Sequence, residues 1–210
     1  MELHLIRHGE SEWHSENRYA GHTDISLNSE GRSQAEILVS WAEIIKPDVI
    51  FTSDLSRAID TAKPMSDRLG LIPHTSSLLR EVNFGSIEGL TPEEFKSKYP
   101  KLWTNFSKEP ATTIMPEGES GDSALIRAWP MLKEIFLTNL DRKVVIVFHG
   151  TLMRLVSCKL LGIDLNEYRR VFPEIQNLGR ILLRVSVPDS ANRLQAGIVR
   201  IDKIEPFVKR

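Results

Sequence analysis

The sequence is poor in cysteine: Cys158 is the single one among 210 residues. This count excludes an internal disulfide and is typical of a protein from a reducing compartment. We expect Cys158 to be a buried structural thiol on an apolar helix face. No apolar run approaches the roughly 20 residues of a membrane-spanning helix, and the N-terminus enters a predicted strand without a signal-peptide pattern. The sequence therefore predicts a cytoplasmic protein with no membrane partner.

The sequence also lacks an excess of charge of either sign. It has 27 Lys and Arg against 28 Asp and Glu, a formal net charge of -1. A basic field that would indicate nucleic acid as a partner is therefore absent. Internal repeats and low-complexity linkers are absent too, and the 41% hydrophobic and 26% charged residues are ordinary for a globular protein. We expect a single domain over residues 1–210.

Two apolar runs end in the same way, in a histidine followed by glycine. Residues 3–6 precede Arg7 and His8, and the β-branched run at 144–148 precedes His149. Both runs are typical of strands, and the second is typical of a buried parallel strand. Ligands of open α/β sheets bind beyond the carboxyl ends of the strands. If the two strands are neighbours, His8 and His149 lie side by side at a site suited to an anionic group.

The remaining sequence alternates between strand and helix patterns, which is typical of parallel βαβ units. We expect an α/β fold: a three-layer sandwich with a mostly parallel central sheet, one antiparallel edge strand and helices on both faces. The predicted helices cover residues 28–46, a segment ending near 69, a segment beginning near 120, and 151–161. The further predicted strands are 49–51, 180–187 and 194–201, with a loop at 78–91 and a break at 188–192.

Two local features carry further expectations. Thr52, Ser53 or Asp54 is expected to cap the helix that ends near residue 69. Residues 92–118 contain four prolines and a cluster of aromatic residues, and they predict a helical insertion that forms a partial lid. Its aromatic side chains could be core packing or an aromatic cap over the leaving group of a substrate. These side chains are Phe95, Tyr99, Trp103 and Phe106.

The segment around the first histidine resembles the signature of the histidine phosphatase superfamily, which includes the phosphoglycerate mutases. The signature is Leu5-Ile6-Arg7-His8-Gly9-Glu10-Ser11. Further segments resemble that family's later motifs in the same order along the chain: residues 21–35, 52–62, 79–89, 116–120 and 149–150. An Arg-His-Gly triplet alone would be weak evidence, whereas five ordered motifs are strong evidence.

The resemblance implies that His8 is the nucleophile and forms a phosphohistidine that water then hydrolyses. A neutral imidazole suits this role if its other nitrogen gives its proton to a backbone carbonyl. Arg7, Arg57 and His149 would be both catalytic and substrate-binding, because phosphoryl transfer depends on fixed donors to the equatorial oxygens. Without the resemblance, Arg57 would be read as a solvated helix residue and His149 as a neutral helix cap.

Glu81 would protonate the leaving oxygen and then activate water. Glu88 is the rival carboxylate, but its place before a glycine matches a structural position of the family motif. Two histidines with Glu81 could also suggest a metal site. The neighbouring arginines would oppose a bound cation, so we expect no metal and no cofactor.

The chain departs from the family pattern at two positions. His14 stands where relatives carry a phosphate-contacting asparagine, and it is expected to bind substrate with a charge that depends on pH. Ala20 stands where relatives often have a polar residue that faces the substrate. These departures leave the identity of the substrate open.

Three functions remain in competition. The first is a cofactor-independent phosphomonoesterase acting on a small-molecule phosphate monoester. The second is a 2,3-bisphosphoglycerate-dependent phosphoglycerate mutase, whose longer insertion carries arginines for the second charged end of its substrate. Here no arginine occurs between Arg80 and Arg127, which predicts a pocket short of extra cations. The third is a non-catalytic phospholigand-binding protein. The sequence does not indicate an oligomeric state.

Overall fold

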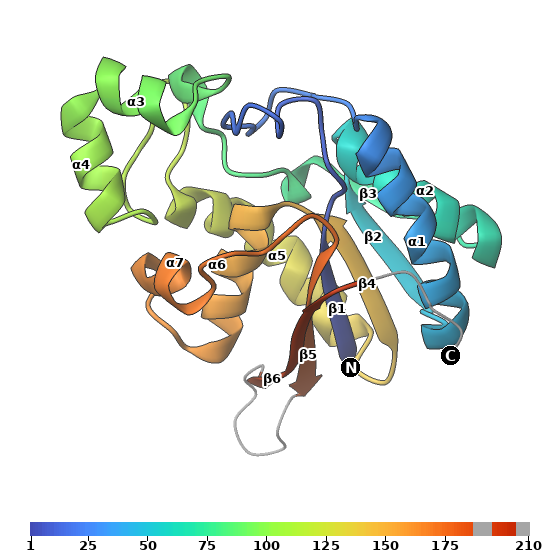
Figure 1. Cartoon of the computed structure of the whole chain (residues 1–210). Coiled ribbons are helices and arrows are strands. Elements are labelled where there is room, and N and C mark those ends of the chain that lie inside the picture. The colour runs from blue at the N-terminus through green and yellow to red at the C-terminus, as the bar shows by residue number, and fades with distance from the viewer. Residues whose placement is uncertain (187–194, 205–210) are drawn as a thin grey trace.

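The computed structural model of the chain describes residues 1–186 and 195–204, with the backbone alone at 195–199. In this part of the chain, six strands form one mixed sheet in the order β3-β2-β4-β1-β5-β6 (Figure 1). The strands are β1 (Glu2–Arg7), β2 (Val49–Ser53), β3 (His74–Ser76), β4 (Lys143–Phe148), β5 (Gly179–Ser186) and β6 (Gln195–Lys203). Strands β1 to β4 are parallel, and β5 is antiparallel to both β1 and β6. The predicted fold class is confirmed, with one refinement: the antiparallel strand lies one position in from the edge, which β6 occupies.

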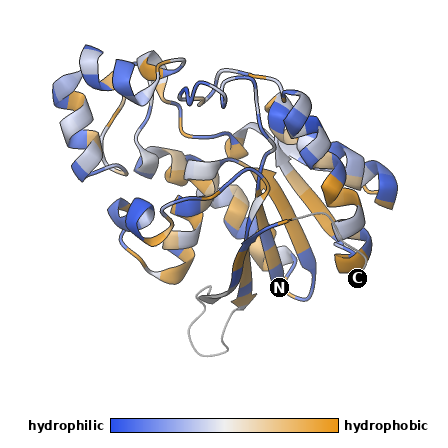
Figure 2. Cartoon of the chain, viewed as in Figure 1, coloured by the Kyte–Doolittle hydropathy of each residue, from blue (hydrophilic) through white to orange (hydrophobic). Residues whose placement is uncertain are grey.

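Helices cover both faces of the sheet, so the central strands are buried on both sides. Alternate residues of β4 show this: Val145 and Val147 belong to the same apolar cluster as α1 and α2, whereas Val144 and Ile146 pack with α5 and α6. The orange strands at the centre of Figure 2 lie between these layers. The unbroken apolar sequence of β4 follows from this double burial. The covering helices are α1 (Ser29–Ile45), α2 (Ser56–Leu69), α5 (Gly121–Thr138) and α6 (Gly150–Leu161).

The ends of most helices follow from local chemistry. The Asn28 side chain accepts a hydrogen bond from the Gly31 amide and caps α1, which begins where the sequence predicts. Gly70 and Gly162 end α2 and α6 in the left-handed conformation, with φ of 65° and 68°. The predicted strand at 180–187 is β5, and the predicted strand at 194–201 is β6. The predicted break at 188–192 lies outside the described residues.

The prediction of a local cap for α2 is wrong. Its N-cap residue is Leu55, which has no capping side chain. Asp24, far away in the sequence, accepts hydrogen bonds from the Ser56 amide and hydroxyl, both at 2.8 Å. A distant carboxylate therefore stabilises the positive end of α2.

The predicted insertion contains two helices, α3 (Pro92–Lys98) and α4 (Pro100–Lys108), beyond one end of the sheet (Figure 1). The interpretation of its aromatic residues as core packing is confirmed for Phe95 and Phe106, which are buried. Tyr99 and Trp103 pack against the same core from partly buried positions.

The sequence patterns missed several short elements: β3, the 3-10 helices η1 (Ser77–Leu79), η2 (Gly85–Ile87) and η3 (Leu165–Glu167), and α7 (Tyr168–Val171). The predicted loop at 78–91 contains η2 and most of η1. Among the described residues, no helix combines the length and apolar character that crossing a membrane requires.

Candidate active site

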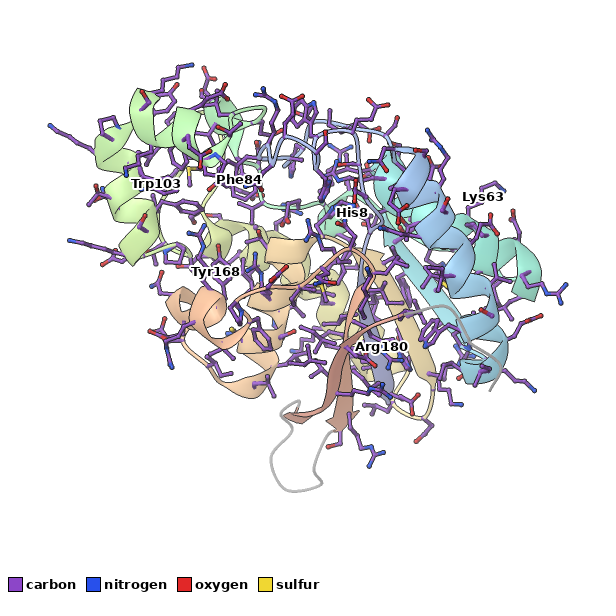
Figure 3. All side chains as sticks on the ribbon, viewed as in Figure 1. His8, Lys63, Phe84, Trp103, Tyr168 and Arg180 are labelled. Atoms are coloured by element: carbon purple, nitrogen blue, oxygen red, sulfur yellow. The ribbon has the colours of Figure 1, made fainter. Side chains whose placement is uncertain are left out.

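The carboxyl ends of β1 and β4 bring the two histidines together. The strands are parallel neighbours with Arg7 opposite Phe148, so the residues that follow, His8 and His149, lie side by side. Their ring centroids are 5.3 Å apart. The predicted pairing is confirmed, and Figure 3 shows His8 at this end of the sheet. A Cβ atom on Gly150 would lie 3.3 Å from Arg7 Nε, so glycine lets the guanidinium approach the start of α6.

His8 is held with one ring nitrogen engaged and the other available. Nδ1 lies 2.7 Å from the Gly9 carbonyl oxygen, the contact expected for a fixed tautomer. Since a carbonyl only accepts, Nδ1 carries the proton and Nε2 carries the lone pair. Burial, followed by the charges of Arg57 and Arg7, holds the pKa of His8 well below its usual range. The imidazole is therefore neutral and nucleophilic near neutral pH.

Arg7 is oriented by its neighbours and still has unused donors. Nη1 donates to the Ile175 carbonyl at 2.6 Å, and Nη2 lies 2.7 Å from His14 Nε2. Nε is buried without a hydrogen-bond partner among the described residues. Burial lowers the pKa of Arg7 to about 10, so the side chain stays charged at neutral pH.

His14 lines the site as expected, but its ring contacts protein rather than open space. Arginine has only donors, so His14 Nε2 must be the acceptor of the bond from Arg7. Nδ1 lies 2.8 Å from the Ser11 hydroxyl oxygen and 3.1 Å from the Ser11 amide nitrogen. Burial and then Arg7 lower the pKa of His14 to about 4. The dependence of its charge on pH therefore falls in the acidic range. Direct contact of His14 with substrate stays a prediction.

Arg57 and His149 lie behind His8 and are both 0% exposed. Arg57 donates to the backbone carbonyls of Thr23 and Gly21 at 2.9 and 2.7 Å, and its Nε has no partner among the described residues. Both ring nitrogens of His149 are likewise without partners there, and His149 makes no side-chain cap on α6. Burial, followed by Arg57, lowers the pKa of His149 well below its usual range.

Unpartnered donors therefore converge behind and beside the nucleophile. Buried polar groups in folded proteins are nearly always hydrogen-bonded, so such a group of exceptions points to a ligand. Two of these groups are guanidinium ions, so the ligand that they suit is an anion.

Glu81 faces the same space from the loop after η1. Its Oε1 accepts from the amides of Val82 and Leu152, both at 2.9 Å, and its Oε2 accepts from the Thr151 amide at 2.8 Å. The carboxylate is thus fixed on the first turn of α6, directly after His149. One bond at Oε2 leaves that oxygen free to contact a further group.

Glu88, the rival carboxylate, is a structural residue. It accepts from the amides of His22 and Thr23 at 2.8 Å and of Phe84 at 3.0 Å. These contacts tie the segment after β1 to the loop around η2. The choice of Glu81 over Glu88 agrees with this geometry.

Arg127 supports the Glu81 loop, a role that the sequence did not indicate. Its guanidinium donates to the carbonyls of Leu78, Arg80 and Glu81 at 2.8, 3.2 and 3.1 Å. Glu119 accepts from the same guanidinium at 2.7 Å. The donor lies on α5 and its acceptors lie some 50 residues earlier, so only the tertiary structure shows this clamp.

A cavity of about 270 Å³ opens in front of His8. Arg7, His8, His14 and Glu81 line it, whereas the fully buried Arg57 and His149 are not among its lining residues. Tyr19 and Phe84 are its aromatic lining residues; the four aromatic residues of the insertion are not among them. The expected aromatic cap from the insertion is therefore absent from the lining.

The expectation of a pocket short of extra cations is wrong. Arg18, Arg154 and Arg169 also line the cavity, from the segment after β1, from α6 and from α7. Together with Arg7, four arginines line the cavity, compared with two glutamates, Glu81 and Glu174. The insertion indeed carries no arginine, but other parts of the chain supply them. Arg154 and Arg169 were missed because neither belongs to a recognised motif.

Comparison with known proteins places the chain among phosphate-handling enzymes. A family model described as "Histidine phosphatase superfamily (branch 1)" matches residues 3–186. Phosphoserine phosphatase 1 of Hydrogenobacter thermophilus is 33% identical over 168 residues, 80% of each protein. A 2,3-bisphosphoglycerate-dependent phosphoglycerate mutase of Cytophaga hutchinsonii is 32% identical over 176 residues, 80% of this chain and 81% of that protein. The solved structure of a mycobacterial glucosyl-3-phosphoglycerate phosphatase superposes with a TM-score of 0.87 at 26% identity, covering 96% and 99% of the two chains.

Proposed function

The chain belongs to the histidine phosphatase superfamily, branch 1, as a phosphatase, and from this premise we propose that it hydrolyses small organic phosphate monoesters through a phosphohistidine at His8. The observation that carries the proposal is the neutral His8, whose free Nε2 lies among unpartnered donors. A cavity of about 270 Å³ suits a small substrate. Two of the relatives are named for phosphoserine and glucosyl-3-phosphoglycerate, both small phosphate monoesters.

The first step transfers the phosphoryl group to the enzyme. His8 Nε2 attacks phosphorus while the bond from phosphorus to the ester oxygen breaks. Glu81, protonated, gives its proton to that oxygen, and the alcohol leaves. Arg7, Arg57 and His149 donate to the equatorial oxygens. His14 stays in the proposal as a substrate-binding residue, next to Arg7.

The second step regenerates the enzyme. Glu81, now a carboxylate, takes a proton from a water molecule as the water oxygen attacks phosphorus. The bond from His8 Nε2 to phosphorus breaks, inorganic phosphate leaves, and Nε2 regains its lone pair. The proton balance closes, since Glu81 gives one proton and recovers one. None of these steps requires a cofactor or a metal. We further propose that α3 and α4 act as a partial lid within a single domain.

The decisive experiment measures phosphate release from a panel of sugar, amino-acid, nucleotide and phosphoglycerate esters. His8→Ala is the test variant, and His74→Ala, at an exposed histidine on β3, is its matched control. We expect hydrolysis by the wild type and the control, no hydrolysis by His8→Ala, and acid-labile phosphate trapped on His8 in the wild type. Full activity of His8→Ala would refute the proposal.

The mutase is the second candidate, because a mutase is among the relatives at 32% identity. Conversion of 3- to 2-phosphoglycerate faster than hydrolysis of either compound would favour it. Tight binding of phosphate or vanadate without turnover on any ester would instead favour the non-catalytic binding protein.

A further inference from the structure

Three arginines of the cavity have no role in the proposed phosphoryl transfer, and two of them, Arg154 and Arg169, form no ion pair in the described part of the chain. Arg154 lies on α6, one turn after Gly150, and Arg169 lies on α7. Both line the same cavity as His8. Taking the proposed function as its basis, we propose that Arg154 and Arg169 form a subsite for a carboxylate on the leaving group. The preferred substrates are then phosphate monoesters of small hydroxy acids.

The two guanidinium groups are oriented by contacts that leave donors unused. Arg154 donates from Nε to the Gly150 carbonyl at 2.9 Å and from Nη1 to the Phe172 carbonyl at 3.2 Å. Arg169 donates from Nε to the Tyr168 hydroxyl at 3.1 Å. In the described part of the chain, Arg154 Nη2 has no hydrogen-bond acceptor, and Arg169 faces only the neutral hydroxyls of Tyr168 and Tyr19.

Aromatic rings hold the same two groups in place. The Arg169 guanidinium carbon lies 4.1 Å from the ring centroid of Phe106, a buried residue of α4. The Arg154 guanidinium carbon lies 4.9 Å from the ring centroid of Tyr168. Stacking on a ring orients a guanidinium without neutralising its charge. The insertion thus contributes to the subsite by supporting Arg169 through Phe106.

Two other exposed or half-buried arginines nearby have carboxylate partners, whereas Arg154 and Arg169 have none among the described residues. Arg18 forms ion pairs with Glu16 and Glu94, and Arg170, next to Arg169, pairs with Glu167. Burial lowers the pKa of Arg154, which agrees with a cation partly withdrawn from water. Charges in such surroundings are normally paired, so the missing partner is an anion that the substrate supplies.

The size of the cavity favours a carboxylate over a second phosphate. A carboxylate is the smaller, planar group, and it matches the planar fork of a guanidinium with two parallel hydrogen bonds. The cavity holds about 270 Å³, and Glu174 lines it together with Glu81.

The test compares esters that differ at a single group. 3-Phosphoglycerate and glycerol 3-phosphate differ in a carboxylate against a hydroxymethyl group, as phosphoserine and phosphoethanolamine differ in a carboxylate against hydrogen. We expect the wild type to favour the acid of each pair by roughly tenfold to hundredfold in kcat/KM, as for a hydrogen-bonded ion pair. Arg169→Met should remove most of this preference and leave hydrolysis of p-nitrophenyl phosphate within about threefold of wild type.

The control variant is Arg170→Met, at the neighbouring exposed arginine, which should keep the full preference. Equal rates for both members of each pair in the wild type would overturn the inference. So would an equal loss on acidic and neutral esters in Arg169→Met, since that result indicates a structural role. Hydrolysis of glycerol 1,3-bisphosphate, which has a phosphooxymethyl group in place of the carboxylate, more than about twofold faster than that of 3-phosphoglycerate would overturn the choice of a carboxylate.

The two proposals fail in different ways. Hydrolysis of p-nitrophenyl phosphate without any preference for acids refutes the subsite alone. If the wild type hydrolyses no ester, the proposed function fails, and calorimetric binding of 3-phosphoglycerate and glycerol 3-phosphate then decides the subsite. An affinity ratio of tenfold or more that is lost in Arg169→Met supports it, and equal affinities refute it.

Discussion

Replacing His14 by glutamine should make the stability of this protein less sensitive to acid between pH 7 and pH 5. In the native state, His14 Nε2 lies 2.7 Å from Arg7 Nη2 and accepts its hydrogen bond. Protonating that nitrogen would set a donor against a donor and place a second positive charge beside the guanidinium. Burial and then Arg7 accordingly lower the pKa of His14 from 6.5 to about 4.

The size of the effect follows from proton linkage. Between pH 6.5 and pH 4, the unfolded chain binds a proton at His14 and the folded chain does not, so the free energy of unfolding falls as the pH falls. The stabilising contribution of neutral His14 to the free energy of unfolding is fully present above about pH 6.5. With the two pKa values above, wild type loses about 2 kcal/mol at pH 5 relative to pH 7 through this one side chain.

Urea denaturation of wild type and His14→Gln at pH 7 and pH 5 measures this difference. Glutamine keeps an acceptor oxygen for Arg7 but does not titrate, so the variant should lose about 2 kcal/mol less than wild type over this interval. Acid effects of His8 and His149 cancel in the comparison. His74→Gln, at the exposed histidine of β3, should lose as much as wild type. Equal losses in wild type and His14→Gln would refute the assignment of His14 Nε2 as the acceptor of the hydrogen bond from Arg7.

Three further perturbations test the supporting structure. Arg127→Met removes the donors that hold the Glu81 loop, so kcat should fall roughly tenfold to hundredfold with little change in unfolding midpoint. An unchanged kcat would show that the loop keeps its position without Arg127. Phe95→Ala empties a fully buried site in the insertion, and denaturation should show a loss of about 3–5 kcal/mol; a loss below 1 kcal/mol would contradict core packing there. Burial raises the pKa of Cys158 to about 11, so an aromatic disulfide reagent at pH 8 should react with it only after denaturation. Rapid labelling of the native protein would contradict its burial.

The sequence could predict features that depend on a few neighbouring residues. The apolar runs of β1 and β4, the Asn28 cap and the stops at Gly70 and Gly162 follow from local burial and backbone preferences. Because parallel strands of one sheet end at the same edge, the pairing of His8 with His149 also followed once both strands were recognised.

The roles of the candidate site residues came from the order of the motifs rather than from residue chemistry alone. Nothing in local sequence separates Arg57 from an ordinary helix arginine. In the structure, its position behind His8 depends on carbonyls of Gly21 and Thr23, which precede it by more than 30 residues.

The tertiary structure alone decided the features that depend on side chains meeting across the chain. Asp24 caps α2, and Arg7 is held by His14 and by a carbonyl 168 residues away. The charge of the cavity is the clearest case, because counting arginines within the insertion predicted too few, while α6 and α7 supply Arg154 and Arg169. Local preferences set helices and strands, whereas the electrostatics of a cavity depend on which distant charges packing brings within a few ångströms.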